Sequence, residues 1–73
     1  MAAIQVKAEV AGSVWQILAK VGQKVEAGDT LMIIESMKME IPVISEDGGT
    51  VDRIMVDEKA AISEGQVLAV LTR

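Results

Sequence analysis

Residues 35–40 read Glu35-Ser36-Met37-Lys38-Met39-Glu40, one lysine between two methionines at the junction of two similar halves of the chain. When the sequence is shifted by 37 residues against itself, identical residues recur in one ungapped register. Among them are Gly12/Gly49, Val14/Val51, Ile17/Ile54, Gly28/Gly65 and Leu31/Leu68. Two copies are too few for a solenoid, whose core needs at least three stacked units. We therefore expect one closed domain, residues 1–73, with internal pseudo-two-fold symmetry. The alternative is chance similarity among short apolar strands.

The repeated glycines carry an expectation of their own. Glycine is favoured where a bend needs positive φ or where two chain segments approach closely. Gly28 and Gly65 fall in turn-like segments, so we expect positive φ at both. Changing either to Val should then destabilise the fold more than changing Gly49 to Ala.

Composition excludes several classes of function. The chain has no Cys and no His, so a disulfide, a Cys/His zinc site and a Ser-His or Cys-His catalytic pair are excluded. Seven basic and eleven acidic residues give a net charge of −4, which disfavours binding to nucleic-acid phosphates or anionic lipid. We expect no catalytic and no metal-ligating residues, and hence no enzyme acting alone.

The N-terminal residues favour a cytoplasmic protein with no membrane partner. The first seven residues, Met1 to Lys7, lack the basic-then-apolar layout of a secretory signal peptide. No apolar run approaches the ~18 residues that a membrane-spanning helix needs.

Short periodic segments predict an all-β fold. Ile4, Val6, Ala8 and Val10 alternate with polar residues, which is the period-two pattern of a strand with one buried face. Pro42 indicates that its strand lies at a sheet edge or carries a bulge. We expect eight antiparallel strands that close as two sheets or a flattened barrel. They cover residues 4–10, 13–19, a short piece at 25, 30–36, 39–44, 50–56, a short piece at 62, and 67–72, with a loop at 45–49.

Met37 and Lys38 stand where the chain turns between two of these strands. A two-residue hairpin favours a type I′ turn, which needs positive φ at both central residues and normally contains Asn-Gly or Asp-Gly. Two residues other than glycine would be strained there, which suggests a constraint other than stability. The consequence is a primary amine at the extremity of a rigid domain, with polarizable thioethers beside it. Two alternatives stay open at this point: Lys38 as an ordinary solubilising turn residue, and the methionines as core filler.

At these residues the chain resembles the biotinyl domain of biotin-dependent carboxylases, whose signature is E-A-M-K-M, here Glu35-Ser36-Met37-Lys38-Met39. The resemblance covers nearly the whole chain and is closest to small free-standing biotin/lipoyl attachment proteins. It implies a barrel-sandwich hybrid, a flattened β-barrel of two four-stranded antiparallel sheets with the lysine on an exposed hairpin. It also implies that biotin protein ligase joins biotin to the Lys38 amine, with Glu35, Ser36, Met37, Met39 and Glu40 as the flank that is recognised.

Three positions bear on how far the resemblance extends. Ser36 replaces the usual Ala, and Ser or Thr at that place is typical of the related lipoyl domains. Glu58-Lys59-Ala60 replaces the usual turn glycine and acid of the second copy, which leaves the geometry of that turn open. Trp15 aligns with Asp52 in the repeat, so we expect it to be incompletely buried, either as a residue at the barrel edge or as a contact for a partner.

The leading hypothesis is a biotin carrier that shuttles carboxylate between a biotin carboxylase subunit and a carboxyltransferase subunit. A lipoyl carrier, with lipoate on the same lysine, is the alternative within that class. A barrel without any modification, used as an interaction module, is the alternative from another class.

Overall fold

The computed structural model describes residues 3–73, and these residues form the eight strands that the sequence predicts. The bounds are β1 (Ala3–Lys7), β2 (Gly12–Ile17), β3 (Lys24–Val25), β4 (Thr30–Ser36), β5 (Met39–Ile44), β6 (Gly49–Ile54), β7 (Ala61–Ile62) and β8 (Val67–Thr72). Within this described part of the chain no helix is long and apolar enough to cross a membrane. The cytoplasmic location stays a prediction.

Three predicted strands are too long. β1 ends at Lys7 instead of Val10. Its register shifts between Val6 and Lys7, and the amide of Ala8 then donates to the carbonyl of Gln66, just before β8. β2 ends at residue 17 instead of 19, because the amides of residues 18 and 19 both donate to one carbonyl, that of Leu31. β6 ends at residue 54 instead of 56, at the equivalent place in the repeat.

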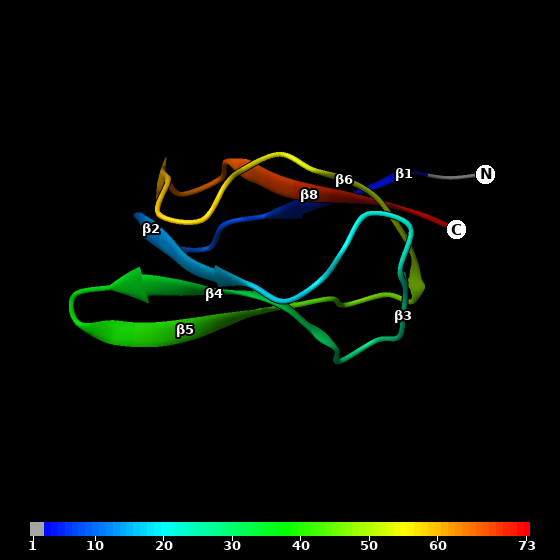
Figure 1. Ribbon diagram of the computed structural model, residues 1–73, viewed down its shortest axis with the longest axis horizontal. Helices are drawn as coiled ribbons and strands as arrows, with labels where there is room; N and C mark the ends of the chain where they lie inside the picture. The colour runs from blue at the N-terminus through cyan, green and yellow to red at the C-terminus, as the bar shows by residue number, and fades with distance from the viewer. Residues whose placement is uncertain (1–2) are drawn as a thin grey trace.

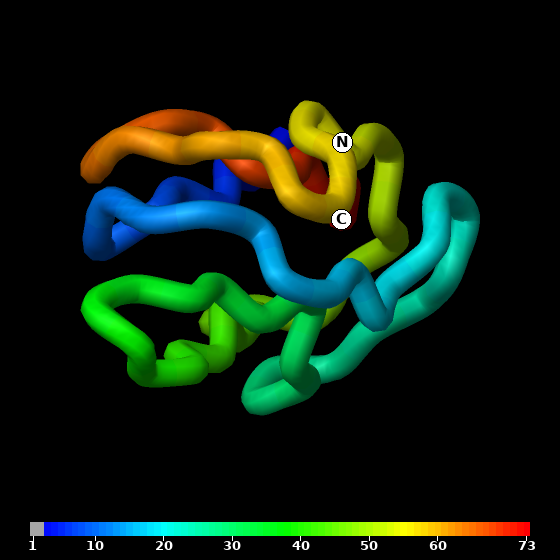
Figure 2. Tube along the Cα trace, turned by 60° about the vertical axis from the view of Figure 1, so that its left-hand side comes forward, coloured from blue at the N-terminus to red at the C-terminus, as the bar shows by residue number. Residues whose placement is uncertain are grey.

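The strands form two four-stranded antiparallel sheets, in the orders β1-β8-β6-β3 and β5-β4-β2-β7. Figure 1 shows these two layers, with the start of β1 and the end of β8 at one end and the β4–β5 hairpin at the other. The molecule is elongated along that direction, with extents of 36 × 17 × 17 Å. In both views the hairpin shares its end of the molecule with the β1–β2 connection, drawn in blue, and the β7–β8 turn, drawn in orange (Figures 1 and 2).

The internal repeat is present in the backbone pairing. The pair Ala3–Thr72 of β1 and β8 corresponds, at an offset of 37, to the pair Glu40–Glu35 of β5 and β4. Pairing of β2 with β4 and of β6 with β8 also matches residue by residue, including a bulge at the same place in each. The predicted pseudo-two-fold symmetry is therefore confirmed. The β8–β1 pair at the chain termini is the structural counterpart of the β4–β5 hairpin.

The turns repeat as well. Gly28 and Gly65 have φ of 95° and 84°, which confirms the expectation of positive φ at both. The turn at Glu58-Lys59 keeps the geometry of its counterpart, because Lys59 takes a positive φ of 73° where Gly22 has 90°. The replaced glycine of the second copy thus leaves the path of the chain unchanged.

Gly49 has a role that the sequence did not reveal, because this residue allows a close approach of two strands. A Cβ on Gly49 would lie 2.6 Å from the carbonyl oxygen of Thr72 in β8. Gly12, its counterpart, lies in the same way against the carbonyl oxygen of Glu35 in β4. By contrast, nothing lies within 4 Å of a Cβ placed on Gly28 or Gly65. The repeated pair Gly12/Gly49 therefore serves strand packing, whereas Gly28/Gly65 serves turn dihedrals.

An aliphatic core fills the space between the sheets. Its buried residues are Ala8, Val14, Ala19, Val25, Leu31, Met32, Ile34, Val51, Ile62, Leu68, Ala69 and Leu71. Ser45, which the sequence assigned to a loop, is fully buried, and its hydroxyl donates to the carbonyl of Asp47. Its counterpart in the repeat is the buried Ala8, and the carbonyls of both accept an amide from a turn glycine, Gly28 and Gly65 respectively. Ser45 thus lies in the loop that the sequence predicts, but with a buried side chain, and the last residue of the predicted loop, Gly49, belongs to β6.

Candidate functional site

The β4–β5 hairpin presents Lys38 at its tip. β4 is an inner strand that pairs with both β2 and β5, whereas β5 is the outermost strand of its sheet. Pro42 lies in β5, which confirms the predicted edge position. An inner strand held on both sides gives the hairpin a rigid base, so the tip is fixed relative to the body of the domain.

The turn itself has the strained geometry that the sequence predicts. Ser36 pairs with Met39, which leaves Met37 and Lys38 as a two-residue connection. Their φ values are 51° and 65°, so both occupy the left-handed region that a type I′ turn requires. For residues other than glycine this region costs roughly 1–2 kcal/mol each. The chain accepts that cost at the place where its amine projects.

The side chains at the tip are open to solvent. Met37 is 92% exposed and Met39 is 63% exposed, so the interpretation of these two methionines as core filler is wrong. Among the methionines of residues 3–73, Met32 of β4 is the one in the core, at 1% exposure. Lys38 is exposed and takes part in neither of the ion pairs found among residues 3–73, Asp52–Arg53 and Asp47–Arg73. Its amine is therefore accessible to a partner.

Ser36 anchors the hairpin to the rest of the domain, a role that the sequence did not reveal. Its hydroxyl donates a hydrogen bond of 2.8 Å to the carbonyl of Ala11 in the β1–β2 connection. The residue that makes the signature resemble a lipoyl site therefore has a structural partner within the domain.

Glu35 and Glu40 lie directly opposite each other, one on β4 and one on β5, and both are exposed. Like charges in directly opposite positions of an antiparallel pair destabilise a sheet. The hairpin thus carries two unfavourable features, a strained turn and a facing pair of carboxylates, within six residues.

Trp15 is 48% exposed, which confirms the expectation of incomplete burial. It lies on β2 within the bulge between Val14 and Gln16. β2 is an inner strand of its sheet, but its pairing with β7 ends at Ser13, so the placement of Trp15 at the barrel edge stays a prediction.

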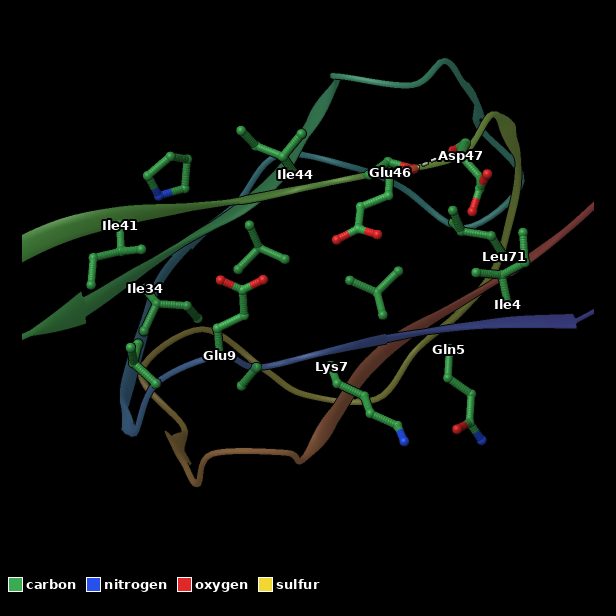
Figure 3. A pocket seen from close by; sticks show the side chains of 16 residues that line it. Ile4, Gln5, Lys7, Glu9, Ile34, Ile41, Ile44, Glu46, Asp47 and Leu71 are labelled. Atoms are coloured by element: carbon green, nitrogen blue, oxygen red, sulfur yellow. Dashed lines mark hydrogen bonds between the residues drawn. The ribbon is translucent and has the colours of Figure 1, made fainter.

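A groove of about 430 Å³ lies elsewhere, at the seam between the two sheets. Its walls come mainly from β1 and β5, the equivalent edge strands of the two sheets, and its apolar floor reaches Ile34 and Leu71 (Figure 3). None of residues 35–40 lines this groove. The hairpin tip therefore projects outside this groove.

Comparison with known proteins gives consistent matches. The family model described as "Biotin-requiring enzyme" matches residues 2–71. The biotin/lipoyl attachment protein of Bacillus subtilis (strain 168) is 37% identical over 67 residues, which is 92% of each chain. The biotinylated protein TB7.3 homolog of Mycobacterium leprae (strain TN) is also 37% identical over 67 residues, 92% of this chain and 94% of the relative.

A solved structure agrees with the fold. The urea carboxylase of Kluyveromyces lactis matches with a TM-score of 0.93 and 35% identity, over 99% of this chain but only 6% of that one. The similarity to the large carboxylase is thus confined to one small domain of it, whereas the two small bacterial relatives match over nearly their whole length.

Proposed function

The chain belongs to the biotin/lipoyl attachment family, and from that premise we propose that biotin is attached to the ε-amine of Lys38. The family membership makes the chain a biotin carrier domain, homologous to the carboxyl carrier domains of biotin-dependent carboxylases. The relatives that match along their whole length are named for attachment and biotinylation, which agrees with a carrier rather than an enzyme.

The observation that carries the proposal is the position of Lys38 at the second residue of a strained, solvent-exposed hairpin turn. A lysine side chain is mostly in its ammonium form at neutral pH, and for that reason it is a weak nucleophile. The partner, biotin protein ligase, would therefore have to bring an activated biotin carboxyl group. The new amide forms between that carboxyl carbon and Lys38 Nζ, the amine loses a proton, and the activating group leaves.

Biotin bound there would supply a ureido nitrogen that accepts and releases carboxylate. The domain itself holds the amine in a fixed position for a partner, because Lys38 stands in the turn that follows β4, a strand that pairs with a neighbour on each side. Tethering makes each transfer effectively intramolecular, with effective concentrations that reach the millimolar range for short flexible linkers. The partners we propose are the biotin carboxylase and carboxyltransferase subunits of a carboxylase.

The lipoyl carrier is the second candidate, because Ser36 occupies a position where lipoyl domains carry Ser or Thr. The hydrogen bond from Ser36 to Ala11 gives this serine a structural role that does not depend on which group is attached. Met37 and Met39 match the biotinyl signature on the other side of the site, so biotin is the group we propose.

Intact mass of the protein purified from its native host tests the proposal, because biotin, lipoate and an unmodified lysine give different masses. Lys38→Arg should remove the biotin adduct completely and leave the melting curve close to that of the wild type, since Arg keeps the charge but is a poor nucleophile. Lys59→Arg is the matched control, because Lys59 is also an exposed turn lysine with positive φ. It should retain full biotinylation. A biotin adduct on the Lys38→Arg protein, or a lipoate mass on the wild type, would refute the assignment.

A further inference from the structure

The internal symmetry separates residues that the fold needs from residues that it does not. Strands β2 and β6 have the same pattern of burial, and a bulge in each exposes two successive side chains. In β2 these are Trp15 and Gln16, and in β6 they are Asp52 and Arg53. Equivalent backbones in equivalent surroundings thus accept an indole in one sheet and a carboxylate in the other.

In β6 the exposed pair is polar, with the Asp52 carboxylate 3.4 Å from the Arg53 guanidinium. In β2 the same place leaves a large aromatic side chain half exposed to water. Tryptophan is among the residue types enriched at the energetic centres of protein interfaces. Trp15 therefore has the character of a contact residue.

The neighbours of Trp15 extend this contrast across the sheet. On β4 the bulge lies beside Ile33, which is partly buried, and Ile33 pairs with the exposed Pro42 of β5. Trp15, Ile33 and Pro42 thus form an apolar strip across three strands, with Gln16, the residue of β2 that pairs with Ile33, beside it. The counterparts of its two ends are Asp52 and Gln5, both polar and exposed, so the other sheet has no such strip.

Closer to the hairpin tip the same face becomes acidic. Glu35 and Glu40 face each other across β4 and β5, and their counterparts in the other sheet, Thr72 and Ala3, are uncharged. Paired residues share a face of the sheet and alternate with the core-facing pair Ile34–Ile41, so these carboxylates lie on the same outer face as the strip. We call the set Trp15, Ile33, Pro42, Glu35 and Glu40 the tip face. It occurs on the sheet that carries Lys38 and has no equivalent on the sheet that carries the termini.

We propose that the tip face docks onto the subunit that loads carboxylate onto the carrier, with Trp15 in an apolar pocket of that subunit and Glu35 and Glu40 against cationic side chains at its entrance. This inference rests on the proposed function. A subunit that draws carboxylate from bicarbonate handles small anions, and clefts that concentrate anions are lined with positive charge. An acidic approach surface on the carrier is complementary to such an entrance.

The position of Trp15 fits docking during transfer rather than attachment of biotin. Trp15 lies beside Ile33 and Ile34, three residues or more before the turn, which is about 10 Å back along the strand at ~3.4 Å per residue. A ligase that modifies the amine of Lys38 must reach only the tip. A flexible arm, in contrast, gives no orientation to the domain that carries it, so the body must provide its own contact for productive delivery.

The decisive variant is Trp15→Asp, which places on β2 the residue that the fold already accepts on β6, and Asp52→Trp is the matched control. Each biotinylated protein is the substrate of the host's biotin carboxylase subunit in an assay driven by ATP and bicarbonate, after intact mass has established its degree of biotinylation. We expect Trp15→Asp to melt within a few degrees of the wild type, to be biotinylated at the wild-type rate, and to show a KM raised at least tenfold. The added negative charge would by itself favour a cationic entrance, so a raised KM reports the loss of the indole. Asp52→Trp should leave KM unchanged.

Salt supplies a second readout. Raising ionic strength should increase the KM of the wild type, and the double variant Glu35→Gln with Glu40→Gln should lose most of that dependence. A KM within twofold of wild type for Trp15→Asp would overturn this inference and leave the carrier function standing. A defect of Trp15→Asp in biotinylation alone would also overturn it, because Trp15 would then serve the ligase. Absence of biotin from the wild-type protein would overturn the proposed function, and this inference with it.

Discussion

Lys59 occupies, in the second half of the chain, the turn position that Gly22 occupies in the first half, and both residues have positive φ. The hydrogen bonds of the two turns correspond: the amide of Gly22 donates to the carbonyl of Val51, and the amide of Lys59 donates to the carbonyl of Val14. These hydrogen bonds hold the turn after β2 against β6 and the turn after β6 against β2, and both strands are inner strands of their sheets. The geometry is therefore imposed by the repeat and not by the residue at the turn.

Lys59→Gly should stabilise the domain. Relief of left-handed strain is worth roughly 1–2 kcal/mol, and the extra freedom of glycine in the unfolded chain returns ~0.5–1 kcal/mol of that. A net gain of ~0.5–1 kcal/mol corresponds to a rise in melting temperature of roughly 2–8 °C for a domain of this size. Thermal unfolding followed by circular dichroism measures it. Gly22→Lys is the reverse substitution at the equivalent turn and should lower the melting temperature. A lower melting temperature for Lys59→Gly would contradict the strain argument.

Gly49→Ala should destabilise the domain more than Gly28→Ala. The new methyl group of the first variant meets the backbone oxygen of Thr72 at 2.6 Å, and a backbone atom in a paired strand cannot move aside easily. We expect a loss near the top of the ~1–3 kcal/mol range for overpacking. At Gly28 the added methyl group has open space around it, so only the positive φ opposes it, at ~1 kcal/mol net. Denaturant midpoints of the two variants decide the order.

Met37→Ala and Met39→Ala should each change the free energy of unfolding by no more than ~0.5 kcal/mol, because both side chains lie in solvent. Met32→Ala supplies the contrast. It removes a side chain that is 1% exposed and should cost ~2–5 kcal/mol. Urea titrations of the three variants test this. Equal losses of unfolding free energy in all three variants would show that the tip methionines contribute to the packing of the domain.

The geometry of the hairpin was predicted better than the ends of several other strands, and the reason is physical. A lysine in a two-residue turn between two strands of alternating pattern must be exposed. The length of the turn and the two-residue period of the strands decide which residues lie in the turn. The bounds of β4, β5 and β8 were predicted correctly for the same reason. These strands are bounded by turns whose residues are readable in the sequence.

The sequence alone does not predict contacts between residues that are far apart along the chain. The role of Gly49 depends on Thr72, and the burial of Ser45 depends on the turn at Gly28. Ser36 is fixed by Ala11, which lies 25 residues away. The internal repeat was the one signal that could have found these relationships in advance. Ser45 aligns with the apolar Ala8 at the offset of 37, which is the mark of a core position.

The last prediction concerns the direction of the amine. Exchanging the two tip residues, Met37→Lys with Lys38→Met, keeps composition and charge, and both positions already have positive φ, so the turn should survive unchanged. Moving a side chain by one residue in a hairpin turns it toward another face. We therefore expect a folded protein that is not biotinylated, with wild-type circular dichroism and no biotin in its intact mass. Placing the lysine at position 39, with Lys38→Met and Met39→Lys, should have the same result, because that residue begins β5. If either folded variant is biotinylated at the wild-type rate, the ligase recognises the local sequence and not the geometry of the hairpin tip.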